Sequence, residues 1–195
     1  MTDVKRKHLV TPNTRPVLLL GDVITRLKEL PAGSVQTCVT SPPYWGLRDY
    51  GVDNQLGLEA TPEEYVTNLV SVFREVRRVL RDDGTVWLNL GDSYFGGGRG
   101  SDAKMRGTIK GQPAYEAVKT AKPNWKDISG LKSKDLVGIP WRVAFALQAD
   151  GWYLRSDIIW NKPNPMPEPV KDRPTKSHEY IFLLAKNKRY YYDAD

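Results

Sequence analysis

Five consecutive residues, Ser41-Pro-Pro-Tyr-Trp45, combine groups that could carry chemistry. Ser41 supplies a hydroxyl that can accept a hydrogen bond, and the fixed φ angles of Pro42 and Pro43 aim a backbone carbonyl that cannot relax away. Tyr44 adds an aromatic face on which a flat ring can stack, a contact worth about 1–3 kcal/mol. Fixed acceptors beside a stacking ring suit an aromatic amine, whose nitrogen lone pair must be localised before it can attack an electrophile. The segment therefore predicts a clamp for a nucleobase.

The elements before this segment should place it at an edge of a sheet. The β-branched run at residues 34–40 predicts a strand, and two consecutive prolines exclude both a continuing central strand and a helix interior. The chain must therefore leave the sheet in an extended loop. Upstream, the apolar residues 16–20 predict a buried strand closed by Gly21-Asp22, and residues 23–30 predict a short helix.

The rest of the chain alternates helical and strand patterns. Thr61, Pro62 and Glu64 are typical of a helix N-terminus, and apolar periodicity continues that helix to about residue 80, where Asp82-Asp-Gly84 should stop it. The later expected elements are a strand at 85–90, a polar turn at 91–94, a helix at 139–150, a strand at 152–160, a proline-rich loop at 161–167 and a strand at 178–185. This order predicts an α/β fold in one domain spanning residues 1–195.

Positive charge is concentrated in one segment. The chain carries 29 Lys and Arg against 23 Asp and Glu, and residues 96–135 hold nine basic and four acidic side chains, which accounts for most of the net charge of +6. This stretch is rich in Gly, Lys, Pro and Ser, so we expect a mobile basic insertion. Its Arg99, Lys104, Arg106 and Lys110 are candidate contacts to the phosphates of a polyanion, although a solvated loop without a specific role would have the same composition.

Other features limit the class of protein. A single cysteine, Cys38, excludes an intramolecular disulfide and fits a reducing cytoplasm. Because no stretch of about 18 apolar residues occurs, we expect a soluble, cytoplasmic protein without a membrane segment. The only histidines, His8 and His178, lack partners at metal-ligand spacing, so we assign no metal.

The motif and its surroundings resemble a known family. Val39-Thr-Ser-Pro-Pro-Tyr-Trp45 is similar to the catalytic motif of DNA amino-methyltransferases, in the serine form usually associated with N4-cytosine enzymes. Similar segments occur at Leu20-Gly-Asp22, at residues 80–94 and at residues 156–163, in the order of the group whose catalytic motif precedes its cofactor-binding motif. The resemblance implies part of a Rossmann-like sheet with flanking helices, methyl transfer from S-adenosyl-L-methionine (SAM), and double-stranded DNA as the partner.

The resemblance also implies roles for individual residues. Ser41 and a carbonyl of Pro42-Pro43 would hold the amino group of a flipped base, and Ser41 would also border the cofactor. The aromatic side chains expected to stack on the base are Tyr44, Trp45 and Trp160. Asp22 would contact SAM near its adenine, although the same residue could simply cap the following helix. Asp92 and Ser93 could support the pocket from behind or could cap the next segment, and Trp160 could instead belong to the core.

One family feature has no counterpart in residues 1–195. The resembled group ends in a Phe-x-Gly-x-Gly-type segment whose glycines approach the methionine part of SAM, and the glycine run at 96–100 follows the wrong strand to replace it. We therefore expect weak or no SAM binding by this chain alone. Truncation of a longer gene product is the favoured explanation, and a complementary SAM-binding half or a homodimer is the alternative.

Three rival functions remain open. N6-adenine methylation is the first, since the serine and aspartate forms of the motif do not divide the two bases without exception. The second is methylation of protein glutamine or RNA by relatives that use Asn-Pro-Pro-Tyr, which Ser41 disfavours. The third is a catalytically incomplete DNA-binding remnant. The recognition sequence cannot be derived, because no side chain is identified as reading base edges.

Overall fold

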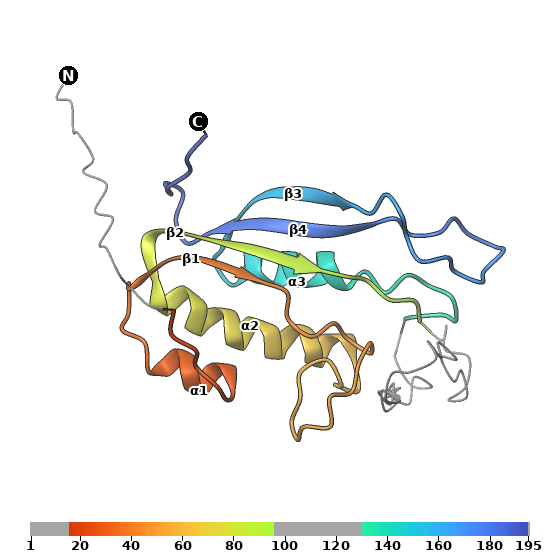
Figure 1. The fold of residues 1–195 in the computed structure, drawn as a ribbon, viewed down its shortest axis with the longest axis horizontal. Coiled ribbons are helices and arrows are strands. Elements are labelled where there is room, and N and C mark those ends of the chain that lie inside the picture. Colours follow the sequence, from red (N-terminus) through yellow and green to blue (C-terminus); the bar gives the residue numbers. More distant parts are fainter. Residues whose placement is uncertain (1–15, 96–129, 195) are drawn as a thin grey trace, which may run out of the picture.

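The computed structural model describes residues 16–95 and 130–194, which form one mixed sheet with helices packed on it (Figure 1). In chain order the elements are α1 (Val23–Lys28), β1 (Val35–Thr40), α2 (Pro62–Val79), β2 (Leu80–Leu90), α3 (Ile139–Ala149), β3 (Tyr153–Asn161) and β4 (His178–Ala185). The strand order is β1-β2-β4-β3. The β1–β2 pair is parallel, whereas β4 runs antiparallel to both β2 and β3. This arrangement confirms the expected α/β fold with flanking helices.

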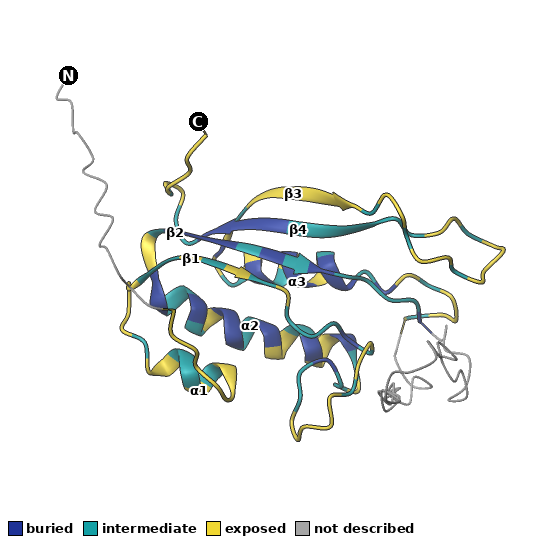
Figure 2. Cartoon of the chain, viewed as in Figure 1, coloured by how far each residue is buried: buried dark blue, intermediate teal, exposed yellow. Residues whose placement is uncertain are grey.

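The core lies between one face of the sheet and α2 and α3. Alternate residues of β2, Val86, Leu88 and Leu90, are fully buried and belong to the same cluster as Leu69 of α2 and Leu147 of α3. Figure 2 shows burial concentrated on α2, α3, β2 and β4, while β3 is exposed along most of its length. Within the described ranges, no helix is both long and apolar enough to span a membrane.

The expected N-terminus of the long helix is confirmed. Thr61 is the N-cap of α2, its hydroxyl accepts a hydrogen bond from the Glu64 amide at 3.1 Å, and Pro62 occupies the first turn. The Glu64 carboxylate accepts from the amide of Ala60 at 3.1 Å, one residue before the cap. These contacts satisfy amides that a helix start otherwise leaves unpaired, so the sequence signal and the geometry have the same cause.

The strand predicted at residues 16–20 is wrong. These residues form no strand, and Val17, Leu18 and Leu20 are each more than 80% exposed. Strand formation needs a neighbour that accepts and donates backbone hydrogen bonds, and in the described part of the sheet β1 pairs only with β2. A short apolar run does not by itself specify such a partner.

The second strand begins earlier than predicted. Helix α2 ends at Val79 and β2 starts at Leu80 rather than at Thr85, because the chain becomes extended directly after the helix. The first residues of β2 pair irregularly with β1. Val35 pairs with Leu80 and Thr37 pairs with Thr85, so the residues between them are looped out of the ladder. Gly84 fits this stretch because a Cβ there would lie 2.9 Å from the Arg81 carbonyl oxygen.

Removal of the α2 cap should lower stability measurably. We expect Thr61→Ala to cost about 1 kcal/mol of unfolding free energy, since the Glu64 amide loses its partner. The matched control is Thr67→Ala inside the same helix, where the hydroxyl donates only to the Glu63 carbonyl and where alanine is the better helix former, so no loss is expected. Urea denaturation followed by circular dichroism measures both changes, and equal midpoints for the two variants would contradict the capping role.

Candidate functional site

Four strand ends meet at one end of the sheet. Because β3 runs antiparallel to β4, and β4 antiparallel to β2, the strands β1, β2 and β3 all point the same way. Their carboxyl ends therefore lie beside the amino end of β4. This is the position at which open α/β sheets place ligand sites. Ser41 follows β1, Gly91 follows β2, Lys162 follows β3, and Glu179 is the second residue of β4.

The predicted motif forms a hydrogen-bond cluster with a residue that the sequence did not single out. Ser41 Oγ lies 3.2 Å from Tyr44 Oη and 3.3 Å from Asn89 Oδ1, and Tyr44 Oη lies 2.7 Å from Asn89 Oδ1. Asn89 Nδ2 donates to the Tyr180 carbonyl at 3.1 Å, which fixes the amide so that its oxygen faces the motif. The side chains of Ser41 and Tyr44 are thus held together by β2.

The two proline carbonyls of the motif have different surroundings. Tyr65 of α2 is completely buried, and its hydroxyl donates to the Pro43 carbonyl at 2.9 Å. The Pro42 carbonyl has no hydrogen-bond donor among the described residues. Tyr65 therefore fixes the backbone of the motif and leaves Pro42 as the carbonyl available to a ligand.

Two glycines make room for the motif. A Cβ on Gly91 would lie 2.5 Å from Cε2 of Tyr44, so the tyrosine ring packs directly on the backbone at the end of β2. At Gly57 a Cβ would lie 2.9 Å from the Tyr44 carbonyl oxygen, and Gly57 has φ +94°. The Gly57 carbonyl accepts from the Gly46 amide at 2.7 Å. The loop after the motif is thereby folded back against it.

An ion pair completes the cluster. Glu179 Oε2 lies 3.2 Å from Tyr44 Oη, and the other carboxylate oxygen pairs with Lys162 Nζ. Partial burial would raise the pKa of Glu179, but the hydrogen bond and charge of Lys162, together with hydrogen bonds from Asn89 and Tyr44, outweigh it and hold that pKa below its usual range. Burial raises the pKa of Tyr44, a hydrogen bond from Ser41 partly offsets this, and Glu179 adds to the rise. At neutral pH the carboxylate is charged and the phenol is neutral.

The motif borders an open cavity of about 270 Å³. It is lined by Ser41, Pro42, Pro43 and Tyr44 together with Leu47, Arg48 and Tyr50 from the following loop. Ser41 and Tyr50 are exposed. The acceptors of the motif are therefore accessible to a ligand from solvent.

The three predicted stacking residues separate into two groups. Tyr44 lies in the site, and Trp160 of β3 is 58% exposed and pairs in register with Glu179, so both remain candidates for stacking on a base. Trp45 does not, and the expectation for it is wrong. Its side chain is 1% exposed in the core, and its indole N–H donates to the Glu59 carbonyl at 3.0 Å. Trp45 instead holds the loop by filling the core beneath it.

The predicted acidic residues act as helix caps. Asp22 is the N-cap of α1, and its carboxylate accepts hydrogen bonds from the amide and hydroxyl of Thr25, which lowers its pKa. Asp92 Oδ1 accepts from the amides of Gly138 and Ile139 at 2.9 and 3.0 Å, and so caps α3, whose own N-cap residue is glycine. These contacts realise the capping alternative for both residues, and a SAM contact by Asp22 stays a prediction.

Other expected contributors are in the core or outside the described residues. Ser93 Oγ is buried without a hydrogen-bond partner among the described residues, so its support of the pocket stays a prediction. Arg99, Lys104, Arg106 and Lys110, the expected phosphate contacts, lie outside the described ranges, as does most of the insertion expected at 96–135. In residues 16–95 and 130–194, no group of three His, Cys, Asp or Glu could hold a metal ion.

Sequence reasoning missed Asn89, Tyr65, Lys162 and Glu179. One signal was available for Asn89, an amide between two apolar strand residues, since a polar side chain inside a strand needs a partner. Glu179 and Lys162 become neighbours of the motif only through the order of the strands, which the sequence does not display.

The fold matches that of solved DNA methyltransferases. The PvuII DNA methyltransferase (cytosine-N4-specific) aligns with a TM-score of 0.56 and 18% identity, over 88% of this chain and 49% of that one. A DNA modification methylase from Thermus thermophilus, TTHA0409, solved with S-adenosyl-L-methionine, aligns with a TM-score of 0.56 and 22% identity, over 90% of this chain and 55% of that one. These alignments show that this chain has the fold of a DNA methyltransferase.

Sequence comparison gives the family. Residues 35–195 match the family model N6_N4_Mtase, described as DNA methylase, and the chain belongs to this family. It is 58% identical to the type II methyltransferase M.Cfr9I of Citrobacter freundii over 177 residues, which are 90% of this chain and 56% of that protein. It is 54% identical to M.SmaI of Serratia marcescens, over 90% of this chain and 58% of that protein. The chain spans about half the length of these curated relatives.

The Tyr65 contact generates a prediction about the motif backbone. We expect Tyr65→Phe to destabilise the protein by about 1–3 kcal/mol, because the Pro43 carbonyl loses its donor. Tyr153→Phe, at an exposed position of β3, is the control and should change stability by less than about 0.5 kcal/mol. Urea denaturation followed by fluorescence measures both variants. Equal stability of the Tyr65→Phe protein and the parent would show that this hydrogen bond contributes nothing to the loop.

Proposed function

We propose that this chain carries the base-binding part of a SAM-dependent DNA methyltransferase. The enzyme would act on the exocyclic amino group of a flipped base in double-stranded DNA, and that group would be N4 of cytosine. The observation that carries the proposal is the Ser41–Tyr44–Asn89 cluster beside the free Pro42 carbonyl. Membership of the DNA methylase family and the type II methyltransferase relatives support it. The serine form of the motif supports cytosine N4.

The cluster explains how a poor nucleophile could be activated. An exocyclic amino nitrogen shares its lone pair with the ring, and two acceptors on its hydrogens draw that lone pair toward the nitrogen. Ser41 Oγ and the Pro42 carbonyl are the two acceptors, and both are fixed by the protein before a base arrives. Tyr44 and Trp160 would hold the ring by stacking, which offsets the cost of removing the base from the duplex.

The described residues fit the base side of the reaction better than the cofactor side. SAM supplies an electrophilic methyl group to the amino nitrogen when it is bound. The acceptors around Ser41 face the cavity where that nitrogen would sit, whereas the Asp22 carboxylate is already used by Thr25. We therefore assign residues 41–44 to the binding of the base and its amino group. We propose SAM contacts only for Ser41 and for Asp22, and Asp22 would first have to release its hydrogen bonds to Thr25.

Replacement of the motif residues should reduce methyl transfer. We expect Ser41→Ala and Tyr44→Ala each to lower turnover on the order of a hundredfold, because one preorganised contact to the amino group or ring is lost. Tyr192→Ala, at an exposed position after β4, should leave turnover unchanged. Transfer of tritiated methyl from SAM to genomic DNA measures the rates. Turnover that survives Tyr44→Ala would exclude the clamp.

The assay needs two arrangements, because the relatives are longer than this chain. Isothermal titration of SAM and the transfer assay are run with the chain alone, and again with the portion of M.Cfr9I outside the matched residues. Transfer in either arrangement supports the proposal, and digestion of the product to nucleosides separates N4-methylcytosine from N6-methyladenine. Absence of transfer in both arrangements, with the fold intact, would favour a DNA-binding remnant.

A further inference from the structure

The hydrogen bonds around Ser41 can run in only one direction while Glu179 is ionised. Tyr44 Oη faces three groups, and two of them, Asn89 Oδ1 and Glu179 Oε2, can only accept. The single phenol proton must therefore point to one of these two. The Tyr44 oxygen can then accept only from Ser41 Oγ–H.

The same constraint determines what Ser41 presents to a ligand. Among the described residues, the two groups within reach of its hydroxyl are Tyr44 Oη and Asn89 Oδ1, and both can accept the Ser41 proton. With its only proton directed inward, the hydroxyl presents lone pairs to the cavity. A base amino group needs such an acceptor, since it offers two hydrogens and no basic lone pair.

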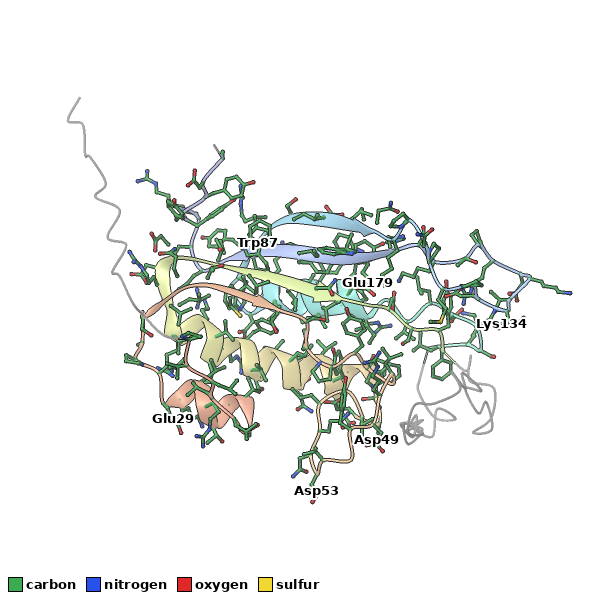
Figure 3. All side chains as sticks on the ribbon, viewed as in Figure 1. Glu29, Asp49, Asp53, Trp87, Lys134 and Glu179 are labelled. Carbon is green, nitrogen blue, oxygen red and sulfur yellow. The ribbon has the colours of Figure 1, made fainter. Side chains whose placement is uncertain are left out.

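Protonation of Glu179 would relax the constraint that acts through Tyr44. A neutral carboxyl could donate to Tyr44 Oη, and the tyrosine could then donate to Ser41 Oγ. Ser41 would direct its proton either to Asn89 Oδ1 or into the cavity. Lys162 opposes this, because its ammonium pairs with the carboxylate from the end of β3. Figure 3 labels Glu179 among the side chains of the sheet. Its 21% side-chain exposure leaves it partly shielded from solvent.

We propose that Glu179, kept ionised by Lys162, is a positioning residue that makes Ser41 a hydrogen-bond acceptor toward the base. This inference rests on the proposed function, because the value of an acceptor at Ser41 depends on an amino group as substrate. Glu179 acts through Tyr44 and touches no reacting atom. In the described part of the chain, the charged or titratable groups that face it are Lys162 after β3, Tyr44 in the motif and Lys176 in the loop before β4.

The first arm of the test needs no activity. The chain is labelled with tyrosine that carries carbon-13 at Cζ, and the Tyr44 resonance is assigned by its absence in Tyr44→Phe. This resonance should shift as Glu179 titrates in acid. Because Lys162 lowers the pKa of Glu179, Lys162→Met should move this inflection to higher pH. The double variant Lys162→Met/Glu179→Gln should show no such inflection. An inflection that persists in the double variant would overturn the proposed contact.

The second arm uses methyl transfer. Glu179→Gln, whose amide can donate to Tyr44 like a protonated carboxyl, should lower kcat about tenfold or more, the equivalent of one charge-assisted hydrogen bond, with KM for DNA nearly unchanged. In Lys162→Met the acid limb of kcat should move to higher pH. Glu75→Gln, which removes the acid of an ion pair with Arg78 on α2, is the matched control and should change neither readout.

The two arms separate failure of this inference from failure of the proposed function. If the parent transfers methyl groups but Glu179→Gln keeps full kcat, the positioning role is overturned and the proposed function stands. If no protein transfers methyl groups, the proposed function fails, while the Tyr44 resonance still decides whether Glu179 controls the hydrogen-bond direction. A fall in kcat together with the shifted inflection in Lys162→Met supports the proposal.

Discussion

The site depends on one feature of the sheet, the antiparallel strand β4 between β2 and β3. Because β4 runs against its neighbours, its amino end lies beside the carboxyl ends of the other three strands. A parallel β4 in the same place would put Glu179 at the far end of the sheet. The side chains that meet come from residues 41, 89, 162 and 179, and this strand order brings them together. The local motif supplies the acceptor, and the topology supplies the charge behind it.

The backbone of the motif is fixed from the side opposite the ligand. Trp45 fills the core under the loop, Tyr65 donates to the Pro43 carbonyl, and the Tyr44 ring packs on Gly91. These contacts involve buried or backbone groups, which move little. They explain why the aromatic residue next to the motif serves the fold rather than the base. A neighbour in sequence can point in the opposite direction, and the pattern Tyr-Trp does not state which ring faces the ligand.

The sequence predicts local structure here better than it predicts contacts. The α2 N-terminus was predictable because its signal, Thr61 with Pro62 and Glu64, is the same set of atoms that forms the cap. The strand at residues 16–20 was not, because burial of an apolar run depends on a partner that local pattern does not reveal. Asp22 and Asp92 show a related ambiguity. A carboxylate after a strand can bind a ligand or cap a helix, and in this structure the carboxylates of Asp22 and Asp92 accept hydrogen bonds from the amides of residues 25, 138 and 139.

The exposure of Ser41 explains why preorganisation matters at this site. The helices α2 and α3 pack on the face that carries Val86, Leu88 and Leu90, so the alternate side chain of Asn89 lies on the other face. Ser41, which follows β1, is exposed. Water weakens electrostatic contacts at an exposed site, and the acceptors cannot rely on a low dielectric to strengthen them. Their effect must come from fixed direction, which the packing behind the motif and, under our proposal, the ionised Glu179 provide before any ligand is bound.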